Sequence, residues 1–185
     1  MKIIFVRHGN VPGLSDRERL TDIGIRQAKL LAKRLKREGI DKIYSSDLPR
    51  AEHTAEFISK ELNLPVERRE CLREYNDGIF FKDKKNWTAV HKKQYRELKS
   101  FLRGLDKNRE KDVTILLVIH SVVNKLIISK FMKINYKKIY FFQQRHACVN
   151  ILKWGEKDGN FGWKLILMGD TSYLPEKLVT ITKKR

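Results

Sequence analysis

The pattern of apolar positions along the chain contains two short, unbroken hydrophobic runs. Residues 3–6 read IIFV and residues 115–119 read ILLVI. Both runs are too short to form a helix, and both are rich in the β-branched side chains that favour strands. They therefore predict two buried strands.

Amphipathic segments with helical spacing lie between and after these runs. Thr21 predicts the N-cap of a helix over 22–38, which Gly39 ends. Pro49 suits the first turn of the next helix, because the missing N–H has no partner there in any case. The buried side of that helix is expected to consist of Ala51, Ala55, Ile58 and Leu62. Further helices are expected over 122–131 and over 87–105, the latter with Val90, Leu98, Phe101, Leu102 and Leu105 on its buried side. The expected strands lie at 42–45, 113–119, 147–152 and 163–168, with a short edge strand at 65–66.

The order of these elements indicates the fold class. A strand, a loop, a helix and a second strand in succession imply a parallel pair with a right-handed crossover. The last two strands flank a turn region with Gly159 and Gly162, which suggests a hairpin and hence an antiparallel edge. The sequence predicts an α/β fold, a three-layer α/β/α sandwich around a mostly parallel sheet with one antiparallel edge strand. Its 185 residues fit one domain spanning 1–185.

Composition narrows the class of protein. Hydrophobic residues make up 41% of the chain, as in globular proteins, and no apolar run approaches the roughly 20 residues that a membrane span needs. The run at 3–6 is also shorter than the core of a secretory signal, so we expect a cytoplasmic protein without a membrane partner. The formal net charge of +18 is compatible with nucleic acid, with anionic substrates or with a solvated lysine-rich surface. The charge is spread along the chain without a nucleic-acid motif, which favours a solvated surface and leaves a nucleic-acid partner open.

The cysteines and histidines argue against a metal centre. Cys71 and Cys148 lie far apart without CxxC spacing, which indicates packing residues in a reducing compartment. The five histidines show no HxH or HExxH pattern. We therefore expect neither a metal nor another cofactor.

Candidate chemistry follows the two buried strands. Arg7, His8 and Gly9 come directly after the first strand, and His120 with Ser121 comes after the other. Ligands of open α/β sheets bind outside the carboxyl ends of the strands, so both histidines lie where a site is expected. Arg50, at the N-terminal end of a predicted helix, is placed to strengthen anion binding there, although its position alone favours an ordinary surface arginine.

Taken together, these motifs resemble the histidine phosphatase superfamily, the phosphoglycerate-mutase-like fold. The resemblance rests on segments in the family's order: Arg7-His8-Gly9, Leu20-Thr21-x-x-Gly24-x-x-Gln27-Ala28, Tyr44-Ser45-Ser46-Asp47-Leu48-x-Arg50-Ala51-x-x-Thr54-Ala55, Leu72-Arg73-Glu74, the strand ending in His120, and Gly169-Asp170-Thr171-Ser172. They cover most of the chain.

The resemblance implies a metal-independent phosphatase that hydrolyses small phosphomonoesters through a phosphohistidine intermediate. His8 would attack the phosphorus with an unprotonated ring nitrogen, while a backbone carbonyl, such as that of Gly9, holds the other nitrogen. Arg7, Arg50 and His120 would surround the phosphate oxygens, whose charge must be held during in-line transfer.

The resemblance also implies a proton donor and two minor contacts. Glu74 matches the family's acid after the Leu-Arg pair, and Asp77, three residues on, remains the alternative. Asn10 would donate to the phosphate from the first loop, and the backbone N–H of Ser121 would do so from a helix start.

Two departures from the family favour hydrolysis over phosphoglycerate mutase chemistry. The segment between Glu74 and the strand ending at His120 lacks a long insertion, and the irregular, basic stretch 79–86 lacks the mutases' Arg- and Pro-rich pattern. A short cover favours release and attack by water, so we expect a phosphatase, with a mutase as the alternative. A non-catalytic polyanion-binding module of the same fold is the third hypothesis. We expect the substrate to be a small phosphorylated metabolite, but the sequence does not identify it. The sequence also leaves open whether the protein forms a homodimer. The cover over the site could be lined by Phe80, Phe81, Lys82, Lys84, Lys85 and Trp87.

Overall fold

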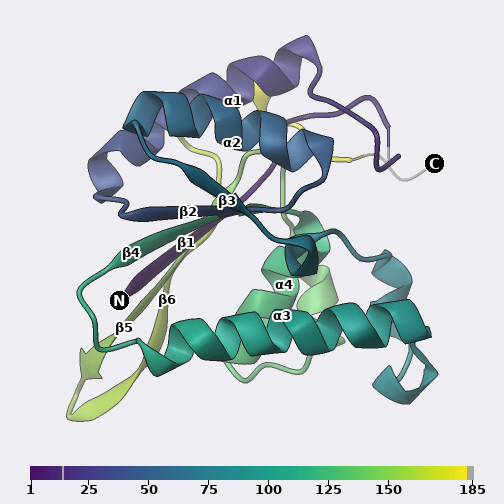
Figure 1. The fold of residues 1–185 in the computed structure, drawn as a ribbon, viewed down its shortest axis with the longest axis vertical. Helices are drawn as coiled ribbons and strands as arrows, with labels where there is room; N and C mark the ends of the chain where they lie inside the picture. The colour runs from purple at the N-terminus through teal and green to yellow at the C-terminus, as the bar shows by residue number, and fades with distance from the viewer. Residues whose placement is uncertain (14, 183–185) are drawn as a thin grey trace.

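A computed structural model describes residues 1–13 and 15–182, except for the side chain of Asp77. Within these residues, six strands form one sheet in the order β3-β2-β4-β1-β5-β6. The elements that Figure 1 labels are β1 (Lys2–Arg7), α1 (Asp22–Leu35), β2 (Lys42–Ser45), α2 (Pro49–Leu62), β3 (Val66–Arg68), α3 (Ala89–Lys107), β4 (Thr114–Ile119), α4 (Ser121–Phe131), β5 (Val149–Lys157) and β6 (Asn160–Asp170).

The sheet is mostly parallel, as the sequence predicts. β1, β2, β3 and β4 pair in parallel, whereas β5 pairs antiparallel with both β1 and β6. The hairpin at the edge is therefore confirmed, and the strand that runs opposite to the others is β5, one position inside the edge. Asp158 and Gly159 form the turn, both with positive φ, as a two-residue hairpin turn requires.

Helices cover both faces of the sheet, which confirms the three-layer sandwich (Figure 1). Because side chains alternate along a strand, Ile4 and Val6 of β1 pack in the core beneath α1 and α2, while Ile3 and Phe5 join the core beneath α3 and α4. The two cores fix β1 from both sides. The rigid strand ends are the places where the polar residues emerge.

The helices agree with the predicted segments with three corrections. The Thr21 side chain caps α1 by accepting the Gly24 N–H, but α1 ends at Leu35 and not at 38, because residues 36–38 tighten into a 3-10 turn before Gly39, which has a φ of 62°. The helix expected at 87–105 begins at Ala89, because the Thr88 side chain caps it. Val90 was expected on the buried side but is 72% exposed, since it lies in the first turn beyond the edge of the core.

The stretch that was expected to be an irregular flap consists of two 3-10 turns, Asp77–Phe81 and Lys84–Asn86. Its aromatic residues divide between core and solvent. Phe80 and Trp87 are buried, and the Trp87 indole donates to the Ile79 carbonyl at 3.1 Å, whereas Phe81 is 65% exposed. The flap is therefore anchored by two buried rings.

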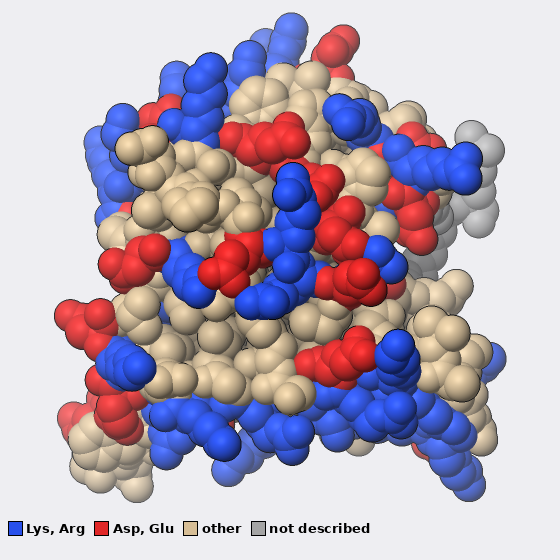
Figure 2. Space-filling view, viewed as in Figure 1, with Lys and Arg blue, Asp and Glu red and all other residues tan. Residues whose placement is uncertain are grey.

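The surface carries its basic residues unevenly. Figure 2 shows Lys and Arg gathered along the side formed by α3, whereas acidic and basic side chains mix over the rest of this face. The exposed basic residues of α3 are Lys93, Arg96, Lys99, Arg103 and Lys107. In the described part of the chain, no helix combines the length and hydropathy needed to cross a membrane.

Candidate active site

His8 lies at the carboxyl end of β1, in a tightly bonded turn. Its backbone N–H donates to the Ile119 carbonyl at 2.9 Å, and its carbonyl accepts the Ala147 N–H at 3.1 Å. The next N–H, that of Gly9, donates to the Thr54 hydroxyl at 3.1 Å. These contacts from β4, from the residues just before β5 and from α2 hold the backbone of His8 and Gly9 on three sides. The side chain is only 2% exposed.

The His8 imidazole is held in one tautomer. Its Nδ1 lies 2.7 Å from the Gly9 carbonyl oxygen, which can only accept, so Nδ1 carries the proton and Nε2 carries the lone pair. Burial lowers the pKa of His8 well below its usual value, and His120, Arg7, His146 and Arg50 lower it further. The ring is therefore neutral, and the Nε2 lone pair is available for nucleophilic attack.

His120 stands beside His8 because their strands are paired in register. Arg7 of β1 is opposite Ile119 of β4, so the residues that follow them emerge together. The two rings are 5.1 Å apart at their centroids with an interplanar angle of 61°. Both His120 ring nitrogens are buried, and neither has a hydrogen-bond partner within the described residues. A buried imidazole without partners is costly unless a ligand satisfies it.

The two predicted arginines reach the same place from different elements. Arg7 ends β1, and Arg50 is the second residue of α2; both are 5% exposed. The Arg7 guanidinium donates to the Gln144 carbonyl at 2.7 Å and to the Thr182 hydroxyl. The Arg50 guanidinium donates to the Ser15 carbonyl at 3.2 Å. Burial, followed by the positive charges of Arg50 and Arg7, lowers the pKa of His120, which places both arginines within electrostatic reach of that ring.

Glu74 joins the site from the loop before the flap. One carboxylate oxygen, Oε1, lies 3.1 Å from the backbone nitrogen of Tyr75 and 3.1 Å from that of Val122. Burial raises the pKa of this carboxyl to about 7, although Arg7 and Arg50 act in the opposite direction. A carboxyl with this pKa can both donate and accept a proton near neutrality. The side chain of Asp77, the alternative donor, lies outside the described part of the structure.

The two minor phosphate contacts that the sequence implies have different surroundings. The Asn10 Oδ1 accepts the Thr21 hydroxyl at 2.7 Å, and its backbone N–H donates to the Gln27 side chain at 2.6 Å. The Asn10 amide thus fixes the first loop to α1. Ser121 is the first residue of α4 and is half-buried. A contact of either residue with phosphate stays a prediction.

Sequence reasoning missed a third histidine in the site. His146 precedes β5 and is 1% exposed, and its ring centroid lies 5.8 Å from that of His8. Its neighbours Thr180 and Thr182 belong to the C-terminal segment. His146 follows no apolar run, and its proximity to His8 depends on the antiparallel pairing of β5 with β1, so no local pattern could have revealed it. The described residues contain no cluster of three or more potential metal ligands.

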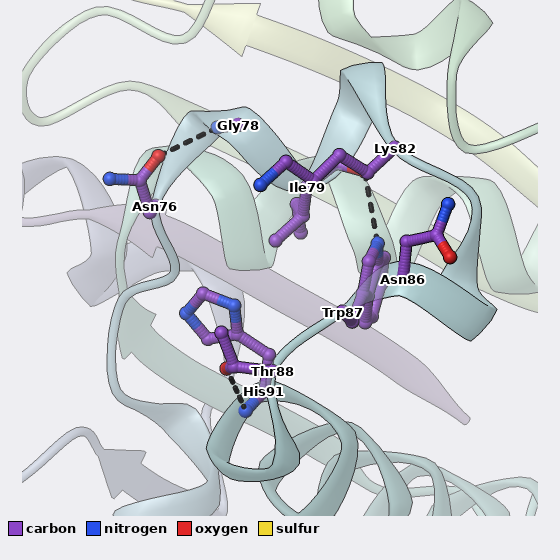
Figure 3. A pocket seen from close by; sticks show the side chains of 8 residues that line it. All are labelled: Asn76, Gly78, Ile79, Lys82, Asn86, Trp87, Thr88 and His91. Carbon is purple, nitrogen blue, oxygen red and sulfur yellow. Dashed lines mark hydrogen bonds between the residues drawn. The ribbon is translucent and has the colours of Figure 1, made fainter.

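A pocket of about 250 Å³ opens beneath the flap. Figure 3 draws the Lys82 side chain and the His91 imidazole on opposite sides of it, with Trp87 along another wall. The pocket adjoins the loop that carries Glu74, because Asn76 lines the pocket and the ring of Tyr75 lies 5.9 Å from the His91 ring. Lys82 is therefore the flap lysine that faces a recess, whereas Lys84 lies against the rings of Tyr95 and Tyr136.

Comparisons with known proteins agree with this geometry. Phosphoserine phosphatase 1 of Hydrogenobacter thermophilus is 28% identical, over 85% of this chain and 88% of that protein. A probable phosphoglycerate mutase of Yersinia pestis is 40% identical, over only 43% of this chain and 40% of that protein.

Two solved structures share the fold. A mutant phosphoserine phosphatase of Entamoeba histolytica in complex with phosphoserine superposes with a TM-score of 0.74, at 23% identity over 94% of this chain and 99% of that one. A mycobacterial glucosyl-3-phosphoglycerate phosphatase in complex with inorganic phosphate gives 0.73, at 19% identity with the same coverage. The sequence profile of the histidine phosphatase superfamily, branch 1, matches residues 3–110 and 94–170. Because this profile matches most of the chain, the chain belongs to the histidine phosphatase superfamily.

Proposed function

We propose that this protein hydrolyses small phosphomonoesters through a phosphohistidine formed on His8, without a metal ion. The observation that carries the proposal is the pairing of His8 and His120. One ring is held neutral with Nε2 unprotonated, and the other, at a centroid distance of 5.1 Å, has no hydrogen-bond partner for either ring nitrogen among the described residues. This pair suits a nucleophile beside a group that binds the transferred phosphoryl oxygens.

In the first step, the Nε2 lone pair of His8 attacks phosphorus while the bond to the ester oxygen breaks. Arg7 and Arg50 hold the charge of the phosphoryl oxygens. His120, neutral in its buried site, still donates one N–H, and the arrival of an anionic phosphate favours its protonated form. Glu74, with a pKa of about 7, gives its proton to the leaving oxygen.

In the second step, water replaces the alcohol. Glu74, now a carboxylate, takes a proton from the attacking water, and the P–N bond of the phosphohistidine breaks to release inorganic phosphate and neutral His8. One carboxyl thus serves as acid and then as base, which requires a pKa near the working pH. The pKa of about 7 fits this double role.

The pocket beneath the flap is our candidate for binding the part of the substrate that is not transferred. Lys82 supplies a positive charge and His91 an imidazole, so the pocket suits a carboxylate or another anionic group. Relatives are named for phosphoserine and glucosyl-3-phosphoglycerate, both of which carry a carboxylate. We therefore propose a small phosphorylated metabolite with a second anionic group as the substrate.

Phosphoglycerate mutase activity is the second candidate. The local match of 40% identity to a probable mutase favours it. A mutase must retain its product for rephosphorylation, however, whereas the cover here is a short flap of two 3-10 turns. Incubation with 3-phosphoglycerate separates the two activities, because a mutase forms the 2-isomer faster than inorganic phosphate and a phosphatase does the reverse.

The experiment that tests the proposed function is hydrolysis of p-nitrophenyl phosphate in EDTA by the wild type and by His8→Ala. Activity that resists the chelator and is lost in the variant supports the mechanism. Substantial hydrolysis by a folded His8→Ala protein refutes it.

A further inference from the structure

Two buried side-chain nitrogens converge on one hydroxyl oxygen at the edge of the histidine pair. The Arg7 Nη2 donates to Thr182 Oγ1, and the His146 Nε2 lies 3.2 Å from the same oxygen. Arg7 is 5% exposed and His146 is 1% exposed. An arginine and a histidine aimed at a single oxygen form the kind of cradle that binds an oxyanion.

The hydrogen bonds around His146 determine which ring nitrogen donates. Its Nδ1 lies 2.9 Å from the Thr180 hydroxyl, and that hydroxyl already accepts a hydrogen bond from the Gln27 amide at 2.9 Å. The Thr180 proton is therefore available for Nδ1. On the other side of the ring, the Thr182 hydroxyl likewise accepts from Arg7, so its proton is equally available for Nε2. The two hydroxyls are therefore compatible with either tautomer.

The Asn10 amide favours Nδ1 as the acceptor and Nε2 as the protonated nitrogen. Its Oδ1 accepts the Thr21 hydroxyl at 2.7 Å, which turns its NH₂ group toward His146 Nδ1 at 3.5 Å. Burial and the charge of Arg7 lower the pKa of His146 to about 3, although a hydrogen bond with the Thr180 backbone acts in the opposite direction, so the ring stays neutral. His146 thus presents one N–H, and it points at the oxygen that Arg7 also binds.

We propose that His146 is a further phosphate-binding residue, whose Nε2–H and the Arg7 guanidinium together hold one oxygen of the phosphoryl group at the position that Thr182 Oγ1 takes in this structure. The assignment rests on the proposed function at His8, whose ring centroid lies 5.8 Å from that of His146. A phosphoryl oxygen is the better acceptor for two donors because it carries negative charge. Phosphate therefore displaces the Thr182 hydroxyl.

This account predicts opposite effects at the two residues. Removing the His146 donor weakens phosphate binding, whereas removing the competing Thr182 oxygen strengthens it. If His146 and Thr182 served only to hold the C-terminal segment in place, neither substitution would separate phosphate affinity from stability. The sign of the Thr182 effect therefore distinguishes the two roles.

The test measures the affinity of inorganic phosphate by calorimetry and as competitive inhibition of p-nitrophenyl phosphate hydrolysis. His146→Phe keeps the ring volume without a donor, and His146→Gln keeps an N–H near the Nε2 position. Thr182→Val keeps the side-chain shape without the oxygen. His53→Phe is the matched control, because His53 lies on α2 and packs against Phe57. Melting temperatures are recorded for every variant.

We expect phosphate to bind about 10- to 100-fold more weakly to His146→Phe, as for one lost hydrogen bond to a charged group. His146→Gln should recover most of this loss, His53→Phe should match the wild type, and Thr182→Val should bind phosphate more tightly. Wild-type affinity in a folded His146→Phe, or weaker binding in Thr182→Val, overturns the assignment. Calorimetry needs no turnover, so the expected binding pattern in a protein that hydrolyses nothing would refute the proposed function and uphold the role of His146.

Discussion

The Glu74 carboxylate accepts the backbone N–H of Val122 at 3.1 Å, which ties the proposed acid to the first turn of α4. His120 is the N-cap residue of that same helix. One short segment therefore positions both the proposed phosphate-binding histidine and the proposed acid. The N-terminal end of a helix also favours a negative charge, so the contact partly offsets the burial of the carboxylate.

The pH dependence of kcat/KM should follow Glu74. The leaving oxygen needs a proton from Glu74, so activity should fall as pH rises through about 7, the pKa of that carboxyl. His8 has a pKa well below its usual value, so no loss of the nucleophile is expected under mildly acidic conditions. Glu74→Gln should lower kcat by about 10²- to 10⁴-fold and abolish the fall above neutrality. An unchanged alkaline limb in this variant would assign the proton donor elsewhere.

Glu74 should also make stability depend on pH. The pKa of its carboxyl is about 7 in the folded protein against an ordinary value of 4.5, so the folded state holds the proton more tightly. The stabilisation is complete below the unfolded pKa and is lost as pH rises through about 7. The melting temperature of Glu74→Gln, relative to the wild type, should therefore be higher at about pH 8.5 than at about pH 4.5. A difference that does not change with pH would contradict the raised pKa.

The sequence alone predicts the parts of the site that depend on the ends of regular elements. His8 and His120 each follow an apolar run, and paired parallel strands release them at one edge of the sheet. Arg50 could be placed because Pro49 marks the start of α2. For these three residues, a local sequence pattern predicts where the strand or helix ends or begins. The layered α/β architecture then brings the three side chains together.

The rest of the site depends on contacts that no local pattern encodes. His146 approaches His8 through the antiparallel pairing of β5, and Thr182 approaches Arg7 from the other end of the chain. Val90 shows a second reason for error, because its spacing matches the apolar stripe of α3 although the core does not extend that far. Periodicity shows which face of a helix a residue lies on, but it does not show how far along the helix the core extends.

Lys82 should contribute to substrate preference and not to chemistry. Lys82→Ala removes the positive charge from the pocket beneath the flap, so KM for phosphoserine should rise about two- to fivefold, as expected for an exposed ion pair. For p-nitrophenyl phosphate, which lacks a carboxylate, KM should not change. Lys85→Ala, also exposed but outside the pocket lining, is the control. Equal effects on both substrates would exclude carboxylate recognition by Lys82.

The close approach of Gly9 and Gly24 should be essential to the conformation of the loop that follows His8. A Cβ on Gly9 would lie 2.6 Å from the Gly24 carbonyl oxygen, and a Cβ on Gly24 would meet the Asn10 backbone. Gly24→Ala should therefore cost about 1–3 kcal/mol of stability and lower kcat, because the loop after His8 must shift. Denaturant unfolding and phosphatase assays measure both effects.

Gly104→Ala provides the comparison, since nothing lies within 4 Å of a Cβ at this exposed position of α3. It should stabilise the protein by about 0.5–1 kcal/mol through helix propensity and leave kcat unchanged. A neutral Gly24→Ala would show that the loop tolerates the added methyl group and that the close approach does not position His8.

The most direct test of the account is to trap the phosphoenzyme. Wild type and Glu74→Gln are quenched in alkali during turnover of p-nitrophenyl phosphate, and the phosphorylated residue is located by mass spectrometry; phosphohistidine survives alkali and is lost in acid. We predict one acid-labile phosphate on His8, which accumulates further in Glu74→Gln because hydrolysis of the intermediate is slowed, and none in His8→Ala. Turnover without a phosphorylated His8, or phosphate carried by another residue, would contradict the account.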